Sequence, residues 1–287
     1  MDSVSKLINS IPSSLLSTFA LETAVDKYSK KLQGEIIFKL LLYCILTEKE
    51  TSLRGMQSAF ETSVFRAFAN ATTAKSISYS SISERLSVIE CSYFEKIFSN
   101  CVKSFKKAFT KNIDEIIRFD STIVSLSSKL LSVGYNLKGG DAENHKLLKF
   151  TIGYSSIPEA VFFYKDQTNN SENVALKNSI ISNFEQQKGQ INVFDRGITS
   201  RANYDLFTEN DIAFISRIDP KAKQDIVKEN KLSKKMNTDS LTIIKDSWVL
   251  LYREGGKKSK YQVRVIKAVK TADNEPISFV TNIRLLS

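Results

Sequence analysis

Two aspartates stand where a carboxylate needs a partner. Asp120 lies in the middle of the apolar, β-branched run 116–126 (IIRFDSTIVSL), and Asp195 directly follows the apolar run 191–194. A bare carboxylate is costly to bury, so Asp120 is expected to be hydrogen-bonded, ion-paired or bound to a metal ion. If the two strands are neighbours, the pair forms half of a two-metal site. In such a site, ions about 4 Å apart activate the attacking oxygen and stabilise the leaving oxygen at a phosphate.

The chemistry of these side chains indicates which metal they would bind. Carboxylate oxygens suit Mg²⁺ or Mn²⁺, so we expect one of these as cofactor, with Asp120 and Asp195 as metal ligands and catalytic residues. Zinc is not expected, because the three cysteines have no C-x-x-C spacing and are predicted to be buried thiols. Each aspartate alone also has a structural explanation. Asp120 could be satisfied by Thr122 or a neighbouring amide, and Asp195 could cap a turn or a helix.

The elements that must position these residues follow from the apolar pattern after residue 112. Strands are predicted at 116–126, 149–154 and 160–164, then a helix at 172–187, a strand at 191–194, a helix at 201–209 and a strand at 212–218. Three strands, helix, strand, helix, strand is the order of an RNase H-like α/β sheet. That topology places the fourth strand beside the first, so the two aspartates should converge at one edge of the sheet.

A β-rich insertion is predicted after the fifth strand, at about 219–276. Its first part, 219–240, is charged and lysine-rich and is expected to be a linker or exposed excursion, whereas 248–252 and 261–269 are predicted to form a hairpin. A last strand is predicted at 277–283. Basic residues of the insertion suit contacts with phosphates, although a solvated face would explain any one basic run equally well. Four of them are candidate DNA-binding residues: Lys221, Lys223, Lys257 and Lys258.

The N-terminal part, 1–111, has helical periodicity and few turn residues. Helices are predicted near 15–25 and 36–46, then one capped by Thr51, and one opened by a capping box of Ser81 and Glu84 that continues past Ile89. A helix-turn-helix could lie between Thr51 and Ile89, although any compact bundle would have the same pattern. The predicted fold class is therefore α/β, with a helical DNA-binding domain at 1–111 and an RNase H-like mixed sheet with its β-rich insertion at 112–287.

Composition limits the partners. The 287 residues include 41 Lys and Arg against 31 Asp and Glu, a formal net charge of +10. This excess favours a polyanion, because each Lys or Arg near a phosphate releases condensed counterions. No segment reaches the roughly 20 apolar residues of a membrane span, and the N-terminus lacks the pattern of a signal peptide. We expect a cytoplasmic, nucleoid-associated protein whose partner is double-stranded DNA.

Three segments in this order, RFDSTIV, INVFDRGI and DIAFISRI, resemble the DDE transposases of the insertion-sequence-four group. These RNase H-like enzymes use bound Mg²⁺ to cut DNA at the ends of a bacterial insertion sequence and to join the freed 3′ ends to target DNA. The resemblance covers residues from about 113 onward, including the closing strand SFVTNIRLLS. It implies that Asp120 and Asp195 are the first and second catalytic aspartates. It also implies that Arg196 and Arg217 are the DNA-binding arginines of these motifs, with Arg217 placed to hold DNA or a carboxylate, and that the protein works as a homodimer on double-stranded DNA.

The sequence departs from this family in two places. Ile198 follows the D-R-G motif where the family has an aromatic residue. The family's spacing of Tyr, two residues, Arg, three residues, Glu is incomplete, because Tyr261 and Arg264 are followed by Ala268 at the Glu position. On the resemblance, the third carboxylate is expected just beyond Ser287. It implies a truncated, incomplete catalytic domain that does not cleave DNA as it stands.

Three classes of function fit these observations. The first is a DNA transposase, inactive in this truncated form. The alternative is a non-catalytic DNA-binding regulator or relic derived from a transposase, which occupies transposon ends or forms inactive dimers with the intact enzyme. A phosphodiesterase of the same fold, unrelated to transposition, is the third class, and it would leave the N-terminal helices unexplained.

Overall fold

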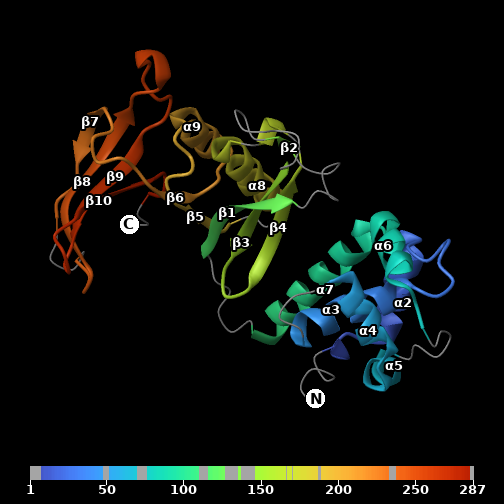
Figure 1. Ribbon diagram of the computed structural model, residues 1–287. Coiled ribbons are helices and arrows are strands. Elements are labelled where there is room, and N and C mark those ends of the chain that lie inside the picture. The colour runs from blue at the N-terminus through green and yellow to red at the C-terminus, as the bar shows by residue number, and fades with distance from the viewer. Residues whose placement is uncertain are drawn as a thin grey trace. The chain divides into compact units, whose positions relative to one another are not determined.

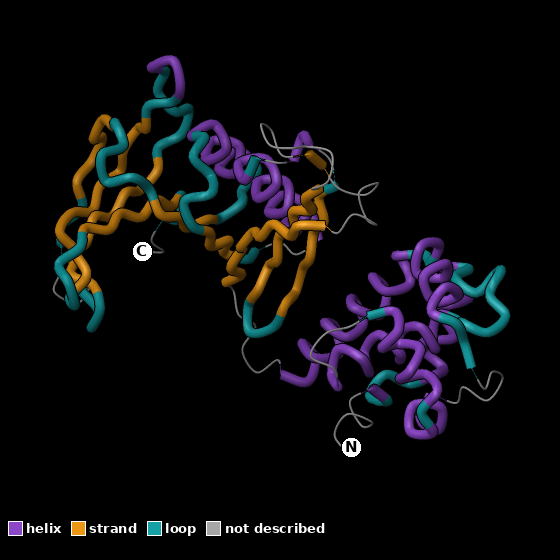
Figure 2. The backbone as a smooth tube through the Cα atoms, in the orientation of Figure 1, coloured by secondary structure: helices purple, strands orange, loops and turns teal. Residues whose placement is uncertain are grey.

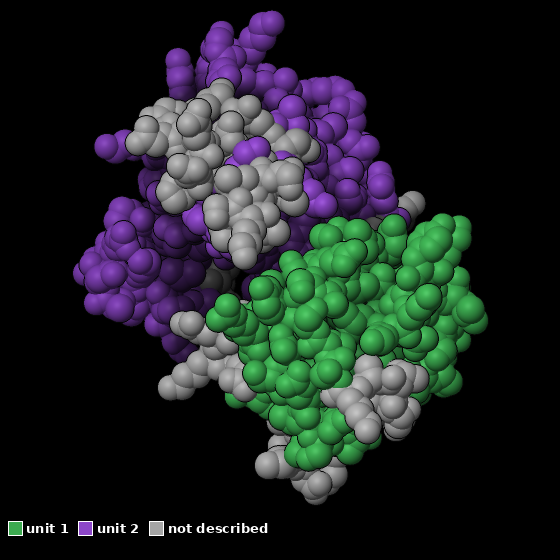
Figure 3. Space-filling view, turned by 45° about the vertical axis from the view of Figure 1, so that its right-hand side comes forward, with its two compact units in different colours: residues 1–110 green, residues 111–287 purple. Residues whose placement is uncertain are grey.

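The chain divides into two compact units, Met1–Thr110 and Lys111–Ser287, which Figure 3 shows in green and purple. Each unit is described by itself. The predicted domain boundary at 111–112 and the predicted helix cap Thr51 lie outside the described residues. The computed structural model describes residues 8–47, 52–69, 76–109, 116–126, 135–136, 146–165, 167–169, 171–186, 189–232 and 237–284.

The first unit is a bundle of helices, blue to green in Figure 1. The central helix α3 contacts α2, α4 and α5. Its side chains Ile37 and Leu40 are fully buried, and the buried Lys39 forms an ion pair with Glu35, one turn earlier, at 2.7 Å. The helices are α2 (Ser13–Thr23), α3 (Gly34–Thr47), α4 (Leu53–Glu61), α5 (Ser63–Ala69), α6 (Tyr79–Val88) and α7 (Cys91–Phe109).

Three predicted details of this bundle are wrong. The residue that caps α6 is Ser78, whose Oγ accepts a hydrogen bond from the Ser81 amide at 3.1 Å, so the predicted cap Ser81 lies inside the helix. The helix does not continue through Ile89, which has extended backbone with φ −70° and ψ 135°. The next helix, α7, begins at Cys91, and the side chain of Cys91 is exposed rather than buried.

The second unit is built on one mixed sheet, orange in Figure 2. Its order is β2-β3-β1-β5-β6-β10-β9-β8-β7, with β4 paired to β3. β1, β5 and β6 are parallel, whereas β3 and β10 run antiparallel to their neighbours. The predicted mixed α/β class is confirmed. The strands are β1 (Ile116–Leu126), β2 (Tyr135–Asn136), β3 (Lys146–Tyr154), β4 (Pro158–Tyr164), β5 (Ile191–Phe194), β6 (Phe214–Arg217), β7 (Gln224–Glu229), β8 (Leu241–Leu251), β9 (Val263–Lys270) and β10 (Pro276–Thr281).

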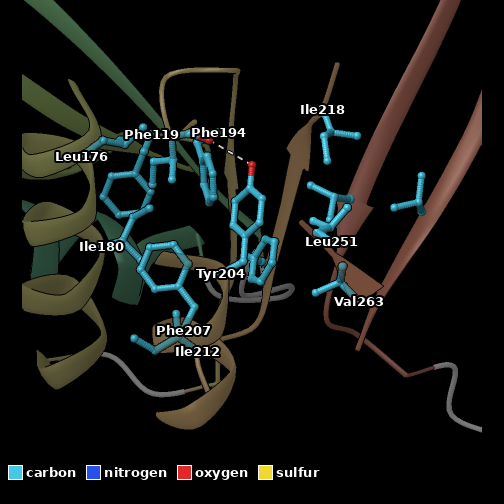
Figure 4. Close-up of a cluster of buried hydrophobic side chains, with 14 of the residues drawn as sticks. Phe119, Leu176, Ile180, Phe194, Tyr204, Phe207, Ile212, Ile218, Leu251 and Val263 are labelled. Carbon is cyan, nitrogen blue, oxygen red and sulfur yellow. Dashed lines mark hydrogen bonds between the residues drawn. The ribbon is translucent and has the colours of Figure 1, made fainter. Parts of the chain in front are cut away.

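Two helices, α8 (Glu172–Gln186) and α9 (Arg201–Glu209), pack on one face of the sheet and enclose its main core. Figure 4 shows Phe194, Tyr204 and Phe207 at the aromatic centre of this core. The ring centroids of these three residues lie 5.1 to 6.0 Å from that of Phe214. Burying a Phe side chain stabilises a fold by roughly 1.5–3 kcal/mol. This core therefore fixes β1, β5 and β6 side by side.

The predicted insertion is a sheet of antiparallel strands. The charged segment expected to be a linker instead contains β7, which pairs with β8 along its length. Between β8 and β9 lies a short 3-10 turn, Glu254–Gly256. The buried carboxylate of Asp205 on α9 holds this hairpin, because it accepts hydrogen bonds from the Lys260 and Tyr261 amides at 3.1 and 2.9 Å and pairs with Arg253. Among the described residues, no helix is both long and apolar enough to cross a membrane.

Candidate functional site

The two candidate aspartates lie just past the stretch where two parallel strands pair: Asp120 is inside β1, and Asp195 directly follows β5. The register between β1 and β5 ends at Phe119 opposite Phe194. One residue further along both chains, Asp120 comes opposite Asp195. Neighbouring strands lie about 4.8 Å apart, so the two backbones are close enough for both carboxylates to reach one ion. Phe119 and Phe194 point into the core, and side chains alternate along a strand, so Asp120 lies on the opposite face.

Arg217 extends this row onto a third parallel strand. The register between β5 and β6 ends at Phe194 opposite Ser216, so Arg217 follows beside Asp195. Its Nη1 lies 3.5 Å from Asp195 Oδ1, in a pair whose side chains are 38% and 68% exposed. A pair this exposed contributes little to stability. Arg217 Nε is buried and has no hydrogen-bond partner among the described residues, so it can still donate to a further acceptor.

The premise that Asp120 is a buried carboxylate is wrong. Its side chain is exposed, and its Oδ1 accepts a hydrogen bond from the Ser121 amide at 2.9 Å. The strand looked uniformly apolar because one set of its side chains enters the core while the other set lies on a partly exposed face. Val124, on the same face as Asp120, is 43% exposed. Because Asp120 is exposed, its carboxylate does not need a metal ion or a cation to offset burial. The register of the two strands is the one observation that places Asp120 beside Asp195.

The described residues bring no third acidic side chain to this pair. No group of three His, Cys, Asp or Glu in the described part of the chain could hold a metal ion. Glu254 lies in the turn between β8 and β9, and Glu275 pairs with Lys270 at the turn before β10. Glu172, at the start of α8, packs so closely against Gly197 that a Cβ there would clash with its carboxylate. Sequence reasoning missed this neighbour, because the contact joins residues 25 positions apart.

The basic candidates do not form one patch. Arg196 is exposed in the turn after Asp195. Lys221 and Lys257 are also exposed, and neither forms an ion pair with a described residue. The other two lysines share one cluster: Lys258 forms an ion pair with Asp225 at 2.6 Å, and Lys223 lies 4.6 Å from the centroid of the Tyr252 ring.

Asp225 and Lys258 shift each other's pKa. Its hydrogen bond raises the pKa of Lys258 above the ordinary value, and the hydrogen bond from Lys258 lowers the pKa of Asp225. Both groups therefore stay charged at neutral pH. A phosphate that binds Lys258 has to compete with this carboxylate, so Lys258 is a weaker candidate for DNA contact than Lys221 or Lys257.

A cleft on the insertion brings together residues whose grouping the sequence does not reveal. Its volume is about 670 Å³, and it is lined by the cations Lys228, Arg264 and Arg284 together with Trp248 and Asn230. Strand pairing explains the arrangement, because Lys228, Trp248 and Arg264 lie opposite one another across β7, β8 and β9. Arg264 forms an ion pair with the buried Asp246, so Lys228 and Arg284 are the cations left for a ligand. An aromatic ring flanked by cations suits an unpaired nucleotide, whose base stacks and whose phosphate is neutralised. This alignment could not be predicted from the sequence, because β7 was not recognised there as a strand.

Comparison with protein-family models and with curated proteins gave no match to this chain. The functional assignment therefore depends on the residues and their geometry. Three features carry it: the Asp120–Asp195 pair just past the paired stretch of β1 and β5, Arg217 beside that pair, and the basic surface of the insertion.

Proposed function

We propose that the protein derives from the DDE transposases, enzymes that cleave and rejoin DNA at insertion-sequence ends, and that Asp120 and Asp195 are its metal-binding pair. The observation that carries the proposal is the register of β1 and β5, which ends one residue before Asp120 and Asp195 and so brings the two aspartates together at the carboxyl end of β5. In open α/β sheets, ligands bind outside the carboxyl ends of the strands.

An RNase H-like core is the fold that best accounts for the sheet order. The strands β4, β3, β1, β5 and β6 follow one another across the sheet, with β1 central, β3 antiparallel to it, and β5 and β6 parallel to it. The helices α8 and α9 precede β5 and β6 in the chain. The antiparallel strands β7 to β10 then follow β6, as expected of an insertion placed after the fifth strand of such a core.

The donor set fits a hard divalent cation. Two carboxylates from neighbouring strands provide oxygen ligands, and both are exposed, so hydrated Mg²⁺ or Mn²⁺ can reach them. Bound there, the ion would polarise a phosphate and activate the oxygen that attacks it. The Arg217 side chain is 38% exposed, so the accessible part of its guanidinium could hold a phosphate oxygen of DNA beside the pair.

DNA binding is supported by charge on both units. The net charge of +10 and the cations around Trp248 suit a polyanion that includes unpaired nucleotides. We propose double-stranded DNA as the partner, bound by a homodimer.

A non-catalytic DNA-binding regulator is the second candidate. The observation that favours it is that the described residues bring only two carboxylates to the site. In-line displacement at a phosphate needs both the attacking and the leaving oxygen stabilised. We therefore propose that the 287-residue chain binds DNA without cleaving it, whichever of the two origins applies.

The test is a calorimetric titration of the full chain with Mn²⁺. We expect Asp120→Asn and Asp195→Asn each to weaken binding by more than about tenfold, because even removal of a residue behind a ligand costs that much. Asp239→Asn, an exposed aspartate away from the site, is the matched control and should bind as the unaltered chain does. DNA binding without any Mn²⁺ binding would instead support the non-catalytic candidate.

A further inference from the structure

The segment between α2 and α3, residues 24–33, presents an aromatic ring among lysines. Tyr28 is 88% exposed, and Lys27, Lys30 and Lys31 are exposed around it. None of the three lysines forms an ion pair with a described residue, and the Nζ of Lys27 lies 5.3 Å from the centroid of the Tyr28 ring. Three unpaired cations within five residues make this segment the most concentrated positive charge of the first unit's described loops.

The segment is held in place by Arg85 on α6. The Arg85 Nε donates to the carbonyl of Leu32 at 2.8 Å, and its Nη2 donates to the carbonyl of Val25 at 2.7 Å. These two hydrogen bonds clamp both ends of the segment to one guanidinium group, which is only 12% exposed. The lysines are therefore presented from a fixed frame, which reduces the entropy lost when they bind a ligand.

Asp26 completes the frame and leaves the lysines free. Its Oδ1 accepts a hydrogen bond from the Gly34 amide at 2.6 Å and lies 3.4 Å from Arg85 Nη2. The carboxylate thus offsets the charge of Arg85. Val25 and Leu32, at the two ends of the segment, are buried. The positive charge that remains for a partner is that of the three lysines.

A cleft of about 570 Å³ lies between this segment and α6. Its α6 wall includes Ser81 and the acidic Glu84, and Glu90 also lines it. The cleft therefore has a basic side and an acidic side. An acidic peptide and a nucleic-acid backbone both suit the basic side. The net charge of +10 and the exposed tyrosine hydroxyl, which can donate to a phosphate oxygen, favour DNA.

We propose that residues 24–33 form a loop that binds the phosphate backbone of duplex DNA, with Lys27, Lys30 and Lys31 neutralising phosphates and Tyr28 donating a hydrogen bond. The inference rests on the proposed DNA-binding function and adds a site for it in the first unit. Glu84 limits the affinity of this loop, because its carboxylate repels a backbone that lies in the cleft.

The experiment measures binding of the full chain to a fluorescently labelled, mixed-sequence duplex between about 50 and 200 mM salt. Each phosphate contact contributes about 0.9 to the slope of log K against log salt. The triple variant Lys27→Gln, Lys30→Gln, Lys31→Gln should therefore reduce the slope by about 2 to 3. Glu84→Gln should tighten binding. Lys96→Gln, which removes a charge already paired with Glu22, is the control and should change the slope by less than one contact.

The outcomes distinguish a failure of the loop proposal from a failure of the proposed DNA-binding function. If the unaltered chain binds no duplex at low salt, the proposed DNA-binding function fails, and this proposal fails with it. If the unaltered chain binds but the folded triple variant keeps the same slope, the loop proposal alone is overturned. Binding of a poly-glutamate peptide, lost in the triple variant while duplex binding is unchanged, would assign the loop to an acidic protein instead. Thermal unfolding at an unchanged temperature shows that the triple variant is folded.

Discussion

At the scale of single residues, the site is defined by position in the sheet and not by burial. In the sequence, Asp120 interrupts one apolar run and Asp195 ends another. In the structure both side chains are exposed. The apolar neighbours of Asp120 belong to the opposite face, where Ile117 and Phe119 enter the core. The sequence therefore identified the residues through a premise about burial that was wrong, and strand register supplies the argument that remains.

The charge of Arg217 predicts the direction in which its removal changes Mn²⁺ binding. Its guanidinium lies 3.5 Å from Asp195, so it repels a divalent cation bound to the same carboxylate. We expect Arg217→Gln to tighten Mn²⁺ binding a few-fold, since a unit charge at this distance in water acts with about 1 kcal/mol. The same variant should weaken duplex binding, because it removes a cation beside the proposed phosphate position. Arg201→Gln, an arginine elsewhere in the unit, serves as the control. Weaker Mn²⁺ binding in Arg217→Gln would show that Arg217 positions Asp195 rather than opposing the metal.

A second residue-scale prediction concerns pH. Burial raises the pKa of Asp246, but hydrogen bonds from Arg264 and Asn230 and the charge of Arg264 outweigh it, so the pKa lies below its ordinary value. Arg264 Nε donates to Asp246 Oδ1 at 2.8 Å. Because the folded pKa lies below the unfolded value of about 3.9, the pair's stabilisation is present above that pH. It is lost as the pH falls through the folded pKa.

We therefore expect Asp246→Asn to lower the free energy of unfolding by about 3 to 5 kcal/mol at neutral pH, because it leaves Arg264 buried without its counter-charge. The loss should shrink as the pH falls below about 3.9, where the unaltered chain loses the same contribution. Urea unfolding at several pH values measures both effects, with Asp239→Asn as the exposed control. A loss that stays constant down to the lowest pH would contradict the assigned ionic state of Asp246.

At the scale of elements, periodicity predicted most helices and strands of the second unit. The helix α9 and the strand β5 have the predicted bounds of 201–209 and 191–194, and α8 begins at the predicted residue 172. β7 was missed because its sequence, QDIVKE, is mostly charged, and its pairing with β8 depends on a partner about 20 residues later. Local pattern cannot reveal a strand whose stabilisation comes from such a distant partner.

The start of α6 was also predicted at the wrong residue. Two serines near this start allow the cap to be tested with a pair of matched variants. Ser78 and Ser81 are both exposed serines near the start of α6, but only Ser78 accepts a hydrogen bond from a free helix amide. Ser78→Ala should lower the free energy of unfolding by about 1 kcal/mol. Ser81→Ala should change it by much less, because the Ser81 hydroxyl forms a hydrogen bond with the Ser78 hydroxyl at 2.9 Å and not with a helix amide. Urea unfolding compares the two variants, and equal losses would contradict the assigned cap.

At the scale of the whole molecule, the sequence predicts the net charge and the order of the elements. It does not predict which residues from distant segments lie together in the folded chain. The excess of basic residues is visible in composition. The row Lys228, Trp248 and Arg264 requires the register of three strands, and the lysines of residues 24–33 are grouped by a guanidinium more than 50 positions away. Folding creates these sites by pairing segments that have no local signal for each other.

The measurement that tests the central claim most directly is anomalous diffraction from crystals of the full chain soaked in Mn²⁺. The account predicts one anomalous peak at the carboxyl end of β5, beside Asp120 of β1, with oxygens of both Asp120 and Asp195 about 2.1 Å from it. The peak should vanish in crystals of Asp195→Asn. A peak that contacts neither aspartate, or Mn²⁺ held equally well by crystals of Asp195→Asn, would contradict the assignment of this pair as a metal site.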